Sequence, residues 1–232
     1  MLSLGMDIGT STVKLVLLKN QEIEKQWMAV HHGNPFVCLK KGLSALELDA
    51  DTPFSLCVTG SNTEALLEQA PDIPSFGDIP AVVEGVRQIV PQAGSVIEIG
   101  SQGARFITDL QSRAPQFAVN EHCAGGTGSF FEDQMSRVGC RLGDYSSLVE
   151  QAQSVPRLSG RCAVFAKTDI IHRQQEGVST PDILLGLCYA MIRNYKATIV
   201  RRLPVCKPVV FCGGVTCNSL SLIHISEPTR PI

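Results

Sequence analysis

The chain has 232 residues, of which 44% are hydrophobic and 18% are charged, and its formal net charge is −2. This size and composition fit one large domain or two small ones with a substantial core. The near-neutral charge argues against a nucleic-acid-binding surface. No apolar run reaches the ~18 residues that a membrane span needs, and the N-terminus lacks the pattern of a signal peptide. We therefore expect a cytoplasmic protein with no nucleic-acid or membrane partner.

Hydrophobic periodicity, together with glycine and proline breaks, divides the chain into two halves that begin in the same way. The first half predicts strands over 2–6, 13–18 and 22–30, a helix over 36–48, a strand over 55–58, and helices over 63–69 and 81–89. The second half predicts strands over 95–99, 105–110 and 116–119, helices over roughly 128–139, 144–152, 163–176 and 181–202, and a strand over 208–212. This order predicts two α/β domains with mixed sheets, residues 1–93 and 94–220.

Nine cysteines are scattered along the chain, and their odd number does not fit the disulfide framework of a small secreted protein. Most are expected to be buried as small apolar side chains, namely Cys38, Cys57, Cys140, Cys188, Cys206 and Cys217. Cys123 and Cys162 are set apart by the motifs in which they lie.

The first strand ends at an acidic residue, Asp7, and a turn rich in glycine and hydroxyl side chains follows it. Backbone amides and hydroxyls in such a turn can bind phosphate oxygens, and the carboxylate can hold Mg²⁺ through water. We take Asp7 as a candidate catalytic residue and expect phosphate binding by Gly9, Thr10, Ser11, Thr12 and Lys14. The alternative is an ordinary β-hairpin with a polar tip.

The same design recurs at the start of the second half, where Glu98 lies near the end of a strand and a glycine-rich turn leads into a returning strand with Arg105. Here the candidate catalytic residues are Glu98 and Gln102, and the candidate nucleotide-binding residues are Gly100 and Ser101. Two such turns can hold a triphosphate from both sides, so the pair is more specific than either turn alone.

Two further glycine motifs follow. The first, residues 123–128, reads Cys-Ala-Gly-Gly-Thr-Gly and leads into an amphipathic helix, whose N-terminus favours anions. The second is a buried strand that runs into a pair of glycines, which suits a flat ring lying against the backbone. The residues assigned to cofactor binding are Gly125, Gly126, Thr127, Gly128, Gly213 and Gly214. A capped loop and a tight strand-to-helix turn are the structural alternatives.

In this order, the motifs resemble those of the acetate and sugar kinase, Hsp70 and actin superfamily. The cysteine–glycine stretch at 123–128 narrows the resemblance to the activators of 2-hydroxyacyl-CoA dehydratases and the ATPase subunits of benzoyl-CoA reductases, the BadF/BadG/BcrA/BcrD type. Cys123 matches the first family cysteine, and Cys162, within Ser-Gly-Arg-Cys-Ala, matches the second. The resemblance covers about residues 2–218.

The resemblance implies an α/β fold of two actin-like, ribonuclease H-like domains around a nucleotide cleft that binds ATP and Mg²⁺. It also implies a homodimer that shares one [4Fe-4S] cluster, with Cys123 and Cys162 supplied by each subunit. In this family, electrons from ferredoxin or flavodoxin pass to a partner of the 2-hydroxyacyl-CoA dehydratase or benzoyl-CoA reductase type, and ATP hydrolysis drives the transfer.

Two departures from the family pattern bear on activity. Where the second turn usually reads Gly-Gly-Gln-Asp, this chain has Gly100-Ser101-Gln102-Gly103, and Arg105 replaces the usual lysine. We therefore expect nucleotide binding with slow hydrolysis. The chain also stops soon after Gly213-Gly214, so the C-terminal part is expected to be truncated. Residues 221–232 resemble translated sequencing-adaptor DNA, and we expect them to be a non-native tail.

The residues leave three alternatives open. Two concern the function: a degenerate nucleotide-binding module of a larger fused protein, or a small-molecule kinase of the same superfamily in which the cysteines are incidental. Zinc is a rival for the metal at Cys123 and Cys162, because thiolates suit both metals, and His122 is an additional candidate ligand.

Overall fold

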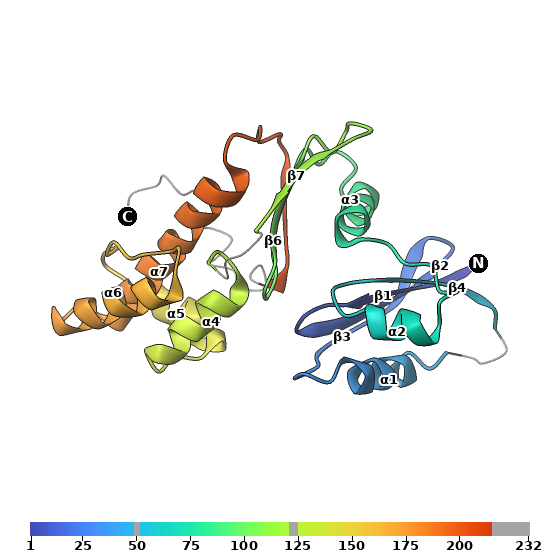
Figure 1. Ribbon diagram of the computed structural model, residues 1–232, viewed down its shortest axis with the longest axis horizontal. Coiled ribbons are helices and arrows are strands. Elements are labelled where there is room, and N and C mark those ends of the chain that lie inside the picture. The colour runs from blue at the N-terminus through green and yellow to red at the C-terminus, as the bar shows by residue number, and fades with distance from the viewer. Residues whose placement is uncertain (49–51, 121–124, 215–232) are drawn as a thin grey trace. The chain divides into compact units, whose positions relative to one another are not determined.

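The computed structural model describes residues 1–48, 52–120 and 125–214. The chain divides into two compact units, Met1–Gln88 and Ile89–Ile232, and each contains a four-stranded mixed sheet (Figure 1). The α/β class with two mixed sheets, which the sequence predicts, is confirmed. Within the described ranges, no helix combines the length and the apolar character that crossing a bilayer requires.

The first sheet has the strand order β3-β2-β1-β4. Its strands are β1 (Leu2–Ile8), β2 (Thr12–Lys19), β3 (Glu22–Val30) and β4 (Phe54–Thr59). β1 pairs antiparallel with β2 and parallel with β4. Because β1 and β4 run in the same direction, the turn after β1 and the segment after β4 lie at the same edge of the sheet.

Alternation along β1 and β2 creates the core of this unit. Leu4, Met6 and Ile8 are buried, and they stand directly opposite Leu17, Leu15 and Val13 of β2, which are buried as well. This period of two places all six side chains on one face of the sheet. That face packs against α1 (Pro35–Ala45), and two further helices, α2 (Glu64–Gln69) and α3 (Asp78–Ile89), follow β4.

The second sheet repeats this topology with the order β7-β6-β5-β8. Its strands are β5 (Ser95–Ile99), β6 (Ala104–Thr108), β7 (Gln116–Val119) and β8 (Val209–Cys212). β5 pairs antiparallel with β6 and parallel with β8, as β1 does with β2 and β4. The two units therefore have the same sheet topology: three consecutive antiparallel strands, and a fourth strand that pairs parallel with the first.

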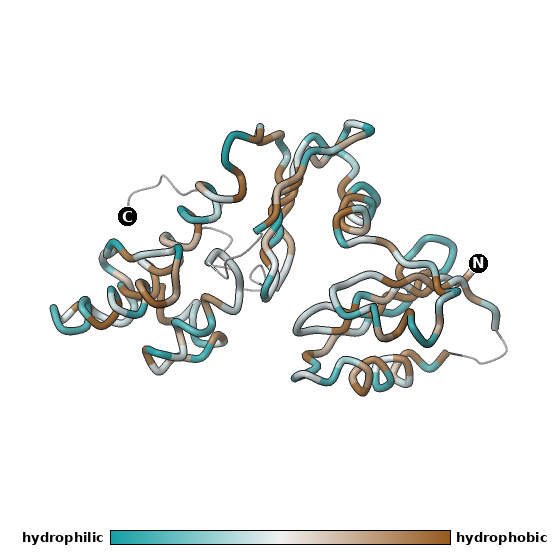
Figure 2. The backbone as a smooth tube through the Cα atoms, in the orientation of Figure 1, coloured by the Kyte–Doolittle hydropathy of each residue, from teal (hydrophilic) through white to brown (hydrophobic). Residues whose placement is uncertain are grey.

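Between β7 and β8 the chain forms a helical layer with its own core. Its elements are α4 (Gly128–Arg137), η1 (Leu142–Asp144), α5 (Tyr145–Val149), α6 (Ala163–Gln175), α7 (Thr180–Tyr195) and η2 (Lys196–Val200). The buried residues of α7 form the centre of this core, and Phe131 and Tyr145 meet edge to face with ring centroids 4.9 Å apart. Along α6, the tube in Figure 2 carries both hydrophilic and hydrophobic segments. Ala166 and Ile170 are buried, whereas Val164 and Phe165 are exposed, so the apolar residues of α6 are not confined to its packed side.

The packing of α1 yields a first prediction. A Cβ added at Gly42 would lie 2.5 Å from Cε3 of Trp27 and 2.7 Å from Cδ1 of Leu15, whereas a Cβ at Gly85, in the exposed part of α3, meets nothing within 4 Å. We expect Gly42→Ala to lower the free energy of unfolding by about 1–3 kcal/mol through overpacking. The matched variant Gly85→Ala should raise it by about 0.5–1 kcal/mol through helix propensity.

Urea denaturation of the two variants beside the wild type measures both changes. Equal stabilities of Gly42→Ala and Gly85→Ala would contradict this account of the contact between α1 and the sheet.

Candidate functional site

The turn between β1 and β2 carries the first set of predicted residues. Gly9 N–H donates to the Thr12 carbonyl at 3.0 Å and closes the turn, which also contains Thr10 and Ser11. Asp7 and Lys14 stand directly opposite each other on the two strands, and Lys14 Nζ lies 2.6 Å from Asp7 Oδ2. The pair thus places one negative and one positive charge at the base of the turn.

The turn between β5 and β6 has the same construction. Gly100 N–H donates to the Gly103 carbonyl at 2.7 Å, and Ser101 and Gln102 form the tip, where Gln102 is exposed. Glu98 and Arg105 stand opposite each other, with Arg105 Nη1 2.7 Å from Glu98 Oε1. The acidic residue, the turn glycine and the cation occupy equivalent positions in both hairpins.

The two ion pairs differ in their solvation. The side chains of Asp7 and Lys14 are 36% and 44% exposed, whereas those of Glu98 and Arg105 are 15% and 20% exposed. Glu98 Oε2 is buried and accepts no hydrogen bond from the described residues. Burial and the nearby Glu98 charge together raise the pKa of the Cys212 thiol to about 12, so this thiol stays protonated at neutral pH.

A glycine in the left-handed region follows the parallel strand of each unit. A Cβ at Gly60 (φ +110°) would lie 2.5 Å from the Ile8 carbonyl oxygen, and a Cβ at Gly213 (φ +95°) would lie 2.2 Å from the Ile99 carbonyl oxygen. Ile8 and Ile99 each precede a turn glycine. Only glycine allows this backbone to pass so close to the turn. Gly214 follows, and the rest of the motif from residue 215 lies outside the described residues.

The helix after the third motif is bonded to the second turn. Gly128 N–H and Ser129 N–H, at the start of α4, donate to the carbonyls of Gly100 and Ser101, each at 2.8 Å. Gly125, Gly126 and Thr127, which precede the helix, are buried. The first amides of α4 are therefore occupied by the turn itself, and they hold the second turn and α4 together.

The same glycine segment packs on the segment that leads to Cys162. A Cβ at Gly125 would lie 2.4 Å from the Arg161 carbonyl oxygen, and one at Gly160 would lie 2.1 Å from the Ala190 carbonyl oxygen in α7. Asp169 Oδ2 accepts from Ser159 N–H at 2.8 Å. Backbone contacts thus fix the segment before Cys162 between the glycine motif and α7.

Cys162 is half-buried and occupies the N-cap position of α6. Cys123, His122 and Ala124 lie outside the described residues, as do Cys217 and the tail at 221–232. The seven described cysteines are all free thiols, and Cys38 and Cys188 are the buried ones among them. Within the described ranges, no cluster of three or more His, Cys, Asp or Glu side chains is arranged to hold a metal.

Two residues at the first turn were not predicted from the sequence. His31 Nε2 lies 3.2 Å from the Gly9 carbonyl oxygen, and Asn62 Nδ2 donates to the same oxygen at 2.8 Å. The sequence offered one signal for His31, its position directly after β3. Val30 at the end of β3 pairs with Thr12 beside the turn, so the next residue lies near the turn. Asn62 has no comparable local signal.

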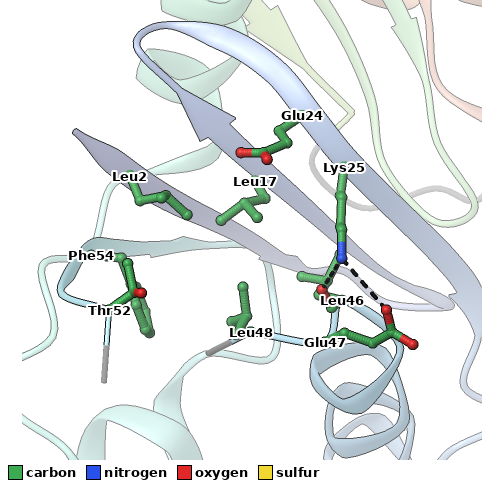
Figure 3. Close-up of a pocket in the computed structure, with 9 residues that line it drawn as sticks. All are labelled: Leu2, Leu17, Glu24, Lys25, Leu46, Glu47, Leu48, Thr52 and Phe54. Atoms are coloured by element: carbon green, nitrogen blue, oxygen red, sulfur yellow. Dashed lines mark hydrogen bonds and ion pairs between the residues drawn. The ribbon is translucent and has the colours of Figure 1, made fainter. Parts of the chain in front are cut away.

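A shallow pocket opens elsewhere on the first unit, at the end of β1 and β2 away from the turn (Figure 3). Lys25 crosses its rim and binds the Leu46 carbonyl at 2.7 Å and the Glu47 carboxylate at 3.8 Å. This cation is engaged by the protein itself, and none of the predicted site residues lines the pocket.

Comparison with known proteins agrees with these motifs. A sequence profile of the BadF/BadG/BcrA/BcrD ATPase family matches residues 4–228. The 2-hydroxyisocaproyl-CoA dehydratase activator of Clostridioides difficile is 27% identical over 224 residues, which cover 94% of this chain and 83% of the relative. The activator of lactoyl-CoA dehydratase of Anaerotignum propionicum is 29% identical over 224 residues, which cover 94% of this chain and 85% of the relative. A benzoyl-CoA reductase component of Thauera aromatica is 26% identical over 234 residues, which cover 96% of this chain and 81% of the relative.

Among solved structures, the activator of the 2-hydroxyisocaproyl-CoA dehydratase from Clostridium difficile with bound ADPNP is similar with a TM-score of 0.85 and 26% identity. The match covers 98% of this chain and 85% of that structure. The fold is therefore actin-like, and the resemblance that the sequence motifs indicate is confirmed. With its motifs, its fold and a profile match over nearly its whole length, the chain belongs to the BadF/BadG/BcrA/BcrD ATPase family.

Proposed function

We propose that this chain is an ATP-dependent electron-transfer activator of a CoA-ester dehydratase or reductase. It binds and hydrolyses MgATP, works as a homodimer that shares one [4Fe-4S] cluster, and receives electrons from ferredoxin or flavodoxin. Its partner is an enzyme of the 2-hydroxyacyl-CoA dehydratase or benzoyl-CoA reductase type. The observation that carries the proposal is the continuous backbone contact that links the second turn, α4 and the segment before Cys162.

The two equivalent turns support ATP binding. Each presents a glycine-closed loop beside a carboxylate and a cation, which is a combination suited to phosphate oxygens and Mg²⁺. The Asp7 carboxylate is partly exposed and fits a site for hydrated Mg²⁺, which when bound would neutralise phosphate charge. Glu98 is more buried and paired with Arg105, so its main action is to orient that guanidinium.

The cysteine segment fits a cluster shared by two copies of the chain. A [4Fe-4S] cluster normally takes four thiolates. One chain offers two candidates, Cys123 and Cys162, so a two-fold symmetric pair of chains supplies four. Cys162 is a free thiol at the N-cap of α6, where the helix favours negative charge. Beside it, Val164 and Phe165 are 68% and 65% exposed and offer apolar surface to a second copy.

Backbone contacts offer a route by which nucleotide and cluster can influence each other. A change in the second turn moves the Gly100 and Ser101 carbonyls, to which α4 is bonded. α4 begins next to the glycine segment that packs against Arg161, one residue before Cys162. ATP turnover can therefore alter the surroundings of the cysteine without any rearrangement of the helical core.

The first test of the proposal removes a thiol. We expect Cys162→Ala to abolish iron binding in anaerobically purified protein and to weaken the dimer, because only two of the four thiolates would remain at the two-fold axis. ATP binding should stay intact. Cys140→Ala, a half-buried cysteine on the loop after α4, is the control and should keep the iron. Iron analysis with size-exclusion chromatography measures both effects, and about four irons per dimer in Cys162→Ala would overturn the shared site.

The second test restores a carboxylate at the second turn. A Cβ at Gly103 would meet only the Arg105 guanidinium, at 3.8 Å or more, so the backbone leaves room for a side chain at this position. Because a positioned carboxylate commonly contributes ~10²–10⁴-fold to rate, we expect slow ATP hydrolysis in the wild type and a gain of at least about tenfold in Gly103→Asp. Gly103→Asn is the control for size. Equal steady-state rates at saturating MgATP in all three proteins would contradict this role for position 103.

The third test disturbs the contact between the two cysteine segments. In Gly125→Ala, the methyl group would need to move the Arg161 carbonyl from 2.4 Å to an ordinary contact distance. We expect this displacement to lower the iron content several-fold while the helical core stays folded by circular dichroism. Gly143→Ala, whose Cβ meets nothing within 4 Å, is the control. Full iron occupancy in Gly125→Ala would show that the contact does not support the metal site.

A further inference from the structure

The Gly9 carbonyl at the first turn accepts two side-chain hydrogen bonds from distant parts of the chain. Asn62 Nδ2 donates at 2.8 Å, from the segment after β4. His31 Nε2 lies at 3.2 Å, at the residue after β3. Both residues are also fixed by their own backbones, since Asn62 N–H donates to the Ile8 carbonyl and His31 N–H donates to the Ser11 carbonyl. The two side chains therefore form a rigid pair of donors.

The histidine ring is held in one tautomer. Gly33 N–H donates to His31 Nδ1 at 3.1 Å, so Nδ1 must present a lone pair. The ring proton then lies on Nε2, which donates to the Gly9 carbonyl. His31 is 8% exposed, and its side chain is therefore shielded from competing water. Its two ring nitrogens have distinct tasks, one as an acceptor for the loop after β3 and one as a donor to the turn.

These two bonds decide which way one peptide group faces. Glycine at position 9 tolerates either orientation of the peptide that joins it to Thr10. In a trans peptide, the carbonyl and the following N–H point in opposite directions. With the Gly9 carbonyl directed at His31 and Asn62, the Thr10 N–H points away from them. The flipped peptide would present a carbonyl oxygen in place of this amide, and carbonyl oxygens repel phosphate.

The second unit has a related arrangement. Asn120 directly follows β7, as His31 follows β3, and its side chain also bonds the turn. Its Oδ1 accepts from Ala104 N–H at 2.6 Å, and its Nδ2 lies 3.4 Å from the Gln102 carbonyl oxygen. A polar side chain directly after the third strand thus fixes the turn backbone in both units.

We propose that His31 and Asn62 are positioning residues for nucleotide binding, which hold the Gly9–Thr10 peptide with its amide available to the phosphates of ATP. They act through the backbone and do not themselves touch the nucleotide. This inference rests on the proposed function, because it requires that the first turn binds phosphate.

The experiment uses the different shapes of two histidine replacements in the full chain. The amide nitrogen of Gln can take the place of Nε2 and donate to the Gly9 carbonyl, whereas Asn can replace only Nδ1. We expect His31→Gln to keep the wild-type affinity for MgATP within about threefold. His31→Asn should weaken it about tenfold, because a misoriented Gly9–Thr10 peptide loses the hydrogen bond from Thr10 N–H to a charged phosphate. His32→Asn, at an exposed neighbouring histidine, is the matched control and should not change the affinity.

A second variant tests the same peptide group without depending on how well His31→Asn folds. Asn62→Leu keeps the side-chain size and the backbone bond to Ile8 but removes the donor, and it should also weaken MgATP binding about tenfold. Calorimetric titration with MgATP and with adenosine separates the cause, because adenosine lacks the phosphates and its affinity should stay constant in every variant. The melting temperature of each unliganded variant reports its stability.

The outcomes separate this inference from the function on which it rests. A wild-type chain that does not bind MgATP would overturn the proposed function and this inference with it. MgATP affinities that are equal in the wild type, His31→Asn and Asn62→Leu would overturn the inference alone. An equal loss of affinity for MgATP and adenosine would also overturn it, as would a loss in His31→Gln as large as that in His31→Asn.

Discussion

Each unit depends on the parallel pairing of its first strand with its fourth. β1 with β4, and β5 with β8, run in the same direction, so the turn after the first strand meets the segment after the fourth. This meeting leaves no room for a side chain at Gly60 or Gly213, whose added Cβ atoms would fall within 2.5 Å of a carbonyl oxygen. In the first unit it also brings Asn62 to the Gly9 carbonyl. The parallel pairing of the first and fourth strands therefore explains both the left-handed glycines and the hydrogen bond from Asn62 to the first turn.

The two hairpins have the same construction, but their ion pairs differ in how far they are exposed to solvent. Asp7 and Lys14 form a partly exposed pair, and such pairs are weak and screened by salt. Their side chains can change partners at little cost when an anion or a cation arrives. Glu98 and Arg105 are more buried, and one oxygen of the carboxylate has no donor among the described residues. Removing either partner there would leave a poorly solvated charge, so this pair is better suited to a fixed framework than to exchange.

The sequence predicts what is local and misses what joins distant segments. The acidic strand ends and glycine turns at Asp7 and Glu98 are readable because strand, turn and returning strand are contiguous. The contacts of His31 and Asn62 with Gly9 span 22 and 53 residues, and only the folded sheet brings these residues together. The helix predicted over 36–48 ends instead at Ala45, followed by Leu46 at its C-cap. The pairing of Cys123 with Cys162 stays a prediction, because Cys123 lies outside the described residues.

The start of α4 shows how tertiary structure changes the meaning of a helix terminus. A glycine-rich segment before a helix predicts free amides that attract an anion. Here Gly128 and Ser129 give their amides to the carbonyls of the second turn, and those donors serve to join two parts of one unit. α6 is different, since Cys162 is itself the N-cap and its side chain makes no capping hydrogen bond. The partial positive charge at the N-terminus of α6 can therefore act on the cysteine, while the first amides of α4 join that helix to the second turn. The two helix termini therefore differ in their bonding: the first amides of α4 are used by the second turn, whereas α6 begins at a cysteine whose side chain makes no capping hydrogen bond.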